Sequence, residues 1–85
     1  MNSMNSVVTA LETAILEKIP DAHVHVTPGS DGHYSLLVVS HVFAGKSMLE
    51  SQRLVLGAIA HLMAGESAPV HAIDSLKTRA SAPVK

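Results

Sequence analysis

Apolar residues recur at helical spacing from residue 8 to residue 19. Thr9 and Glu12 have the spacing of a capping box at the start of this segment. Pro20 is expected to end the helix, because proline pushes the residue before it out of the α region. The pattern therefore predicts a first helix over residues 8–19, with a buried face formed by Val8, Leu11, Ile15 and Ile19.

Two strand-like segments follow the first helix. Residues 22–26 alternate, which places two valines on one face and His23 and His25 on the other. Turn-forming residues crowd positions 27–32, and the continuous apolar run over residues 36–39 suits a well-buried second strand. We expect the two strands to form a hairpin.

A second helix is expected after Ser47, which can cap its N-terminus. Apolar side chains between Met48 and Met63 give this helix a broad apolar surface, so it should be the central buried helix. Gly65 suits the position just after its end, and Pro69 prevents it from continuing. Residues 70–76 then form a third strand that can pair parallel to a hairpin strand. The chain is predicted to be α+β, in the order αββαβ, with a three-stranded mixed sheet.

The length of 85 residues allows one domain, residues 1–85, with a thin core. Residues 77–85 are polar and are expected to form a flexible tail. The chain has no cysteine, so it can supply neither a disulfide nor a thiolate ligand for a metal. It also lacks a secretory signal pattern and an apolar run of the roughly 20 residues that span a bilayer. We therefore expect a soluble cytoplasmic protein without a membrane partner.

The formal net charge is −1 with neutral histidines, and the six Lys and Arg residues are scattered. This is a poor electrostatic footprint for a nucleic-acid-binding protein. Six histidines are unusual in so short a chain, and imidazole is the side chain that both titrates near neutral pH and binds transition metals. Neither a nucleophile elbow nor a paired-carboxylate spacing is present, so the sequence does not predict an enzyme.

An ordered series of motifs occupies about half of the chain: the strand-like HYSLLVVS that begins at His33, then Phe43–Ser47, Gln52–Val55 and Val70–Ile73. This series resembles the BolA family. The resemblance implies an αββαβ architecture akin to the type II K-homology fold. It also implies a non-enzymatic protein of iron–sulfur cluster trafficking or iron homeostasis, which shares a [2Fe-2S] cluster with a monothiol glutaredoxin and glutathione.

The resemblance also assigns candidate site residues. His71 matches the family's cluster-binding histidine, and imidazole is a competent iron ligand. Family members supply a second ligand from the loop before the second strand, where this chain has neither Cys nor His, so the nearest candidate is His33. Phe43, Lys46 and Arg53 lie in the shared motifs and are candidates for contacts with the glutaredoxin.

Other interpretations remain open. A nucleic-acid-binding regulator of transcription or stress response is compatible with a K-homology-like fold, and residues 29–32 satisfy the G-x-x-G pattern, although this loop contains an acidic residue that would repel phosphate. A zinc or copper site built on His23 and His25 would need neither partner nor glutathione. We expect His41 and His61 to be surface residues without a metal role. The sequence also leaves open whether the chain forms a homodimer.

Overall fold

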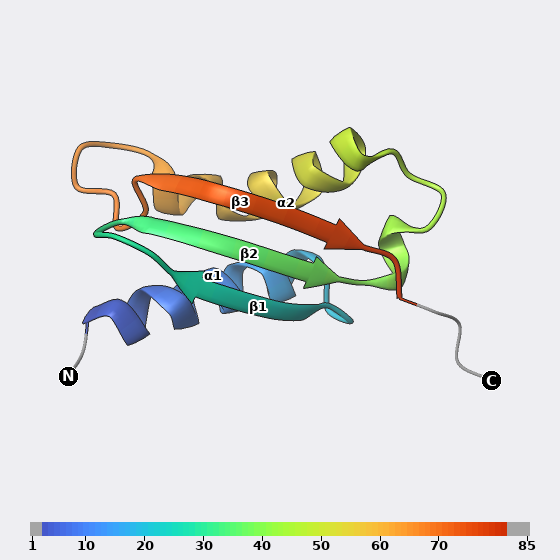
Figure 1. Ribbon diagram of the computed structural model, residues 1–85, viewed down its shortest axis with the longest axis horizontal. Coiled ribbons are helices and arrows are strands. Elements are labelled where there is room, and N and C mark those ends of the chain that lie inside the picture. The colour runs from blue at the N-terminus through green and yellow to red at the C-terminus, as the bar shows by residue number, and fades with distance from the viewer. Residues whose placement is uncertain (1–2, 82–85) are drawn as a thin grey trace.

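The computed structural model describes residues 3–81, with side chains described from residue 6. Its elements follow the predicted order αββαβ (Figure 1). The central strand of the three-stranded sheet pairs antiparallel with the first strand and parallel with the last, which confirms the α+β class and the mixed sheet. The likeness to the K-homology fold stays a prediction. The elements are α1 (Ser3–Lys18), β1 (His23–Pro28), β2 (His33–Val39), the short 3-10 helix η1 (His41–Phe43), α2 (Met48–Met63) and β3 (Ala72–Arg79).

Both helices cover the same face of the sheet, with α1 behind β1 and α2 behind β3 (Figure 1). The side chains of β2 alternate, so that Tyr34, Leu36 and Val38 point into the core and are at most 5% exposed. The opposite face is covered by no other element among the described residues, and we call it the open sheet face. The core is mainly aliphatic, as the composition requires, and its remaining members are Leu11, Ala14, Ile15, Ile19, Phe43, Val55, Ala58, Ile59 and Val70.

Helix α2 is less buried than the sequence predicts. Its N-terminus has the expected cap, since the Ser47 hydroxyl accepts a hydrogen bond from the Glu50 N–H at 3.1 Å and the Glu50 carboxylate accepts one from the Ser47 N–H. However, the helix rests on the sheet along one stripe only, so large apolar side chains on its other side meet solvent. These are Met48, Leu49, Leu54 and Leu56, which are 39–71% exposed.

Two predicted boundaries are wrong. Helix α1 begins at Ser3, so Thr9 lies inside the helix and cannot cap it. The predicted start is too late because the first residues of α1 are mostly polar, so they do not continue the apolar spacing of the later turns. Strand β3 continues to Arg79, pairing residues 77–79 with the end of β2, so the predicted tail does not begin at residue 77. The last part of that tail, residues 82–85, lies outside the described residues.

Candidate functional site

His71 lies directly before β3 and is held by the backbone of the β1–β2 loop. The carbonyl oxygen of Gly32 accepts hydrogen bonds from the His71 N–H at 2.8 Å and from the Ala72 N–H at 3.1 Å. The His71 side chain is exposed and lines an open cleft of about 350 Å³, together with residues 28–32, Tyr34 and residues 68–69. We call this hollow the His71 cleft. The backbone of His71 is thus fixed by hydrogen bonds, while its imidazole is exposed.

His33 begins β2 and is paired with a carboxylate that the sequence did not single out. Its Nδ1 atom lies 2.8 Å from Oδ1 of Asp74, and the two side chains are 39% and 51% exposed. Asp74 sits at an irregularity in the β2–β3 pairing: Ile73 pairs with Tyr34 and Ser75 with the next residue of β2, so Asp74 has no partner in the register. Such a bulge re-aims a side chain. Because Nδ1 faces Asp74, Nε2 is the nitrogen that His33 can offer to an external ligand.

The two predicted ligands lie at the same end of the sheet, since His33 pairs with Ala72, the neighbour of His71. They nevertheless have different surroundings, because His33 does not line the His71 cleft. Among the described residues, no group of three or more His, Asp or Glu side chains could hold a metal ion. Within residues 3–81, His71 and His33 are therefore separate imidazole donors, and a metal group that they held would need further ligands.

His23 and His25 lie on the exposed side of β1. In the part of the chain that the structure describes, neither belongs to a group of three potential metal ligands. A structural zinc site usually has four protein ligands, so the zinc or copper interpretation has little support from this geometry. His61 is exposed on α2, as expected.

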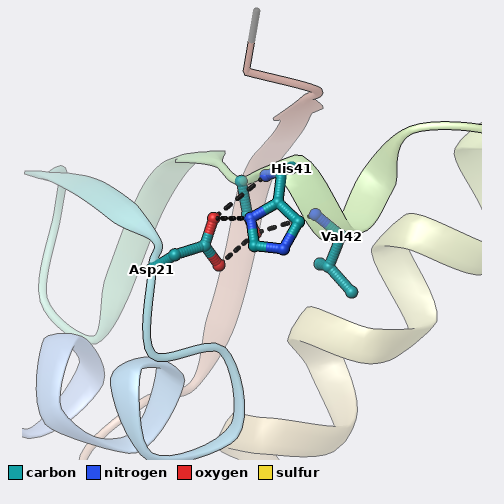
Figure 2. A network of polar contacts seen from close by, with 4 residues as sticks. Asp21, His41 and Val42 are labelled. Atoms are coloured by element: carbon teal, nitrogen blue, oxygen red, sulfur yellow. Dashed lines mark hydrogen bonds and ion pairs between the residues drawn. The ribbon is translucent and has the colours of Figure 1, made fainter. Parts of the chain in front are cut away.

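His41 is exposed, but it takes part in a polar network at the far end of β2 (Figure 2). The Asp21 carboxylate accepts a hydrogen bond from the Ser40 hydroxyl at 2.6 Å and another from the His41 N–H at 3.0 Å. The Nδ1 atom of His41 lies 2.6 Å from Oδ2 of Asp21. Donation from Ser40, followed by the His41 contacts, lowers the pKa of Asp21 from 3.8 to about 2.

This network is structural and not a catalytic triad. The carboxylate stands between the hydroxyl and the imidazole, whereas a triad needs the imidazole in the middle. The Ser40 side chain is fully buried, and its oxygen also accepts a hydrogen bond from the Val42 N–H at 3.1 Å. Through these hydrogen bonds, Asp21 in the α1–β1 turn is linked to Ser40 and His41, which follow β2. No local sequence pattern indicates this network, because Asp21 lies 20 residues from His41.

The predicted partner contacts separate into two kinds. Phe43 is 4% exposed and belongs to the core, so its expected contact with a partner needs correction: it is buried in the apolar cluster instead. Lys46 and Arg53 are exposed and line a shallow hollow of about 290 Å³ with Glu50 and Leu54. Among the described side chains, neither cation forms an ion pair.

The family model described as BolA-like protein matches residues 7–82. The proteins named BolA-like protein 1 of Homo sapiens and Pongo abelii are each 42% identical over 65 residues, which cover 75% of this chain and 45% of each relative. Among solved structures, a bol-like protein from Babesia bovis has a TM-score of 0.68 and 29% identity, covering 85% of this chain and 81% of that one. A BolA protein homologue from Coxiella burnetii has a TM-score of 0.67 and 27% identity, covering 82% and 85% of the two chains.

The two helices packed on one face of a mixed sheet define a small α+β domain of the kind these structures share. The chain belongs to the BolA-like protein family. It spans less than half the length of the curated relatives it matches. Neither of the helices described within residues 3–81 is long and apolar enough to cross a membrane.

Proposed function

We propose that this chain is a non-enzymatic partner protein in iron–sulfur cluster trafficking or iron homeostasis. It binds a [2Fe-2S] cluster jointly with a monothiol glutaredoxin and glutathione, which supply the thiolates that this chain lacks. The observation that carries the proposal is His71, an exposed imidazole whose backbone is fixed by two hydrogen bonds to Gly32 at the edge of an open cleft.

His71 is the first ligand in this proposal. The N–H groups of His71 and Ala72 both donate to the Gly32 carbonyl. These two hydrogen bonds restrict the backbone at the start of β3 and so fix the position of the His71 Cα atom. An anchored ligand loses less conformational entropy when it binds than a ligand on a mobile loop. The His71 cleft leaves room beside the ring for the thiolate-bearing segment of a partner.

His33 is the second ligand in this proposal, through Nε2. The carboxylate of Asp74 holds the opposite ring nitrogen, as carboxylates do for metal-binding histidines in many proteins. His25, which lies on β1 beside β2, is the alternative donor. Lys46 and Arg53 are proposed to contact the glutaredoxin, because both are exposed cations on one surface of α2 and its preceding turn.

The bound cluster would have a mixed shell of thiolate and imidazole. Histidine in place of thiolate on one iron raises the reduction potential, so this cluster should be easier to reduce than one held only by thiolates. The chain's own contribution is to present and orient the imidazoles. The partner contributes the remaining ligands.

Anaerobic reconstitution tests the proposal directly. The protein is mixed with a monothiol glutaredoxin, glutathione, ferric iron and sulfide, and the complex is followed by visible circular dichroism and size-exclusion chromatography. We expect a coloured heterodimer only when all components are present. A stoichiometric [2Fe-2S] cluster on the isolated protein, without partner or thiol, would contradict the shared-ligand proposal.

A second candidate function is nucleic-acid binding, and one observation favours it. The register places His23 in one row with Arg79, and His25 in one row with Lys77, across the open sheet face. The single acidic residue of the three described strands is Asp74, which is already paired with His33. Two cations, Lys77 and Arg79, therefore lie on one face of the sheet beside two histidines, in a chain whose net charge is −1 with neutral histidines.

Fluorescence anisotropy with short RNA and duplex DNA, at roughly 150 mM salt, tests this second candidate. Binding through the open sheet face should weaken in Lys77→Ala and Arg79→Ala and should fall as salt is raised. Absence of binding in the micromolar range, where non-specific binding is usually found, would reject it.

A further inference from the structure

The imidazole of His71 occupies the space that a side chain at position 32 would need. A Cβ atom built on Gly32 would meet Cδ2 of His71 first, and would lie 2.7 Å from Cγ and 3.0 Å from Cβ of the same residue. Carbon atoms that are not bonded to each other pack best at about 3.5–4.0 Å. Any residue other than glycine at position 32 would therefore collide with the ring of His71.

The backbone cannot relieve this collision cheaply. The Gly32 carbonyl accepts both the His71 and the Ala72 N–H groups, so moving the two segments apart would break two hydrogen bonds. The loop is also fixed from within, because the His33 N–H donates to the Ser30 carbonyl at 2.8 Å. The part that is free to move is the exposed imidazole, which would rotate about its side-chain bonds away from the loop.

We propose that Gly32 is a positioning residue for His71. The missing side chain at position 32 lets the imidazole pack against the β1–β2 loop, and this contact sets the direction in which the ring nitrogens point. The consequence for cluster binding rests on the proposed function of His71. Glycine is required here for space as well as for its backbone, since a positive φ of 75° would favour glycine whatever lay nearby.

Gly45 is the matched control that separates these two requirements. Its φ of 78° is nearly that of Gly32, but a Cβ atom at Gly45 would meet nothing within 4 Å. Gly45→Ala therefore imposes the same backbone strain without touching His71. Gly32→Asn is the second test variant, because asparagine tolerates the left-handed region better than alanine yet still carries a Cβ atom.

The experiment compares Gly32→Ala, Gly32→Asn and Gly45→Ala in two measurements. In the free protein, two-dimensional NMR follows the imidazole resonances of His71 and their contacts with the loop. In the complex with monothiol glutaredoxin and glutathione, visible circular dichroism gives the cluster spectrum and its decay gives the lifetime. We expect both Gly32 variants to shift the His71 ring resonances and to shorten the lifetime by roughly tenfold, the lower end of the effect of removing a residue that orients a ligand.

Gly45→Ala should lose thermal stability to a similar extent as Gly32→Ala and keep the parental ring resonances and cluster. Parental His71 resonances in both Gly32 variants would overturn the positioning role. If the ring moves in these variants but His71→Ala leaves the cluster of the complex unchanged, the positioning role is supported and the proposed function fails. The two hypotheses therefore fail by different results.

Discussion

The Nδ1 atom of His33 lies 2.8 Å from Oδ1 of Asp74, a residue 41 positions further along the chain. The contact depends on the irregular pairing between β2 and β3, which leaves Asp74 without a partner strand residue and turns its carboxylate towards His33. The carboxylate selects the ring form with a proton on Nδ1 and a free lone pair on Nε2. In the proposed function, Asp74 would thereby leave Nε2 of His33 as the nitrogen that can bind the cluster.

Replacing Asp74 by asparagine should remove this selection. We expect the Nε2-protonated form of His33 to gain population in long-range nitrogen NMR spectra, and the cluster of the mixed complex to decay about ten times faster. Glu66→Gln is the control, because it removes an exposed carboxylate that makes no described contact with His33 and does not line the His71 cleft. Equal behaviour of the two variants would show that Asp74 has no specific effect on His33.

His71→Ala should abolish or strongly alter the visible circular dichroism of the mixed complex while leaving the fold intact. The side chain is exposed, so its removal should change the free energy of unfolding by no more than about 0.5 kcal/mol. His61→Ala, on the exposed side of α2, is the matched control and should behave like the parent. A parental spectrum and lifetime in His71→Ala would return this residue to a purely structural role.

Acid should destabilise the protein between about pH 4 and pH 2 through Asp21. The folded-state pKa of Asp21 is about 2, below its ordinary 3.8, so its contribution is complete above pH 4 and is lost as the pH falls through 2. Asp21→Asn should lower the melting temperature at neutral pH and flatten its dependence on pH in this window. Glu66→Gln, in an exposed loop, should keep the parental dependence. An unchanged slope in Asp21→Asn would show that the Ser40 and His41 contacts do not stabilise the folded state.

The two sides of α2 should respond very differently to truncation. Ile59 is fully buried, so Ile59→Ala should lower the free energy of unfolding by about 2–5 kcal/mol through lost burial and a cavity. Leu49 is 56% exposed, so Leu49→Ala should change it by about 0.5 kcal/mol at most. Urea denaturation followed by far-ultraviolet circular dichroism measures both. Similar losses in the two variants would mean that α2 does not rest on the sheet in the manner described.

The elements of this fold could be predicted because each has a local signal. Helical spacing marked Leu11 and Ile15, and Ser47 as a capping residue marked the start of α2; both are confirmed. The start of α1 and the end of β3 were misplaced, because polar residues at the rim of a small domain carry little periodic signal. The burial of Phe43 was missed for a related reason: its place in a shared motif did not reveal that the ring enters the core.

The site was only partly predictable. His71 was singled out by its motif and His33 by its position before the second strand. The contacts of His71 with Gly32 and of His33 with Asp74 join segments that α2 separates in the sequence. No local sequence pattern encodes the bulge at Asp74 or the close approach of the His71 ring to Gly32. Only the parallel pairing of β2 with β3 brings these residues together.

That pairing also sets when the site can form during folding. The hairpin and both helices depend mainly on neighbours in the chain, whereas β3 must return across the whole of α2 to reach β2, and such distant contacts form slowly. A chain arrested before this step would hold most of its secondary structure and still lack both the His71 anchor and the His33–Asp74 pair. Protection of the His71 and Ala72 amides from hydrogen exchange would report that the last strand has docked. If the proposed function is correct, only chains in which β3 has paired with β2 would bind a cluster.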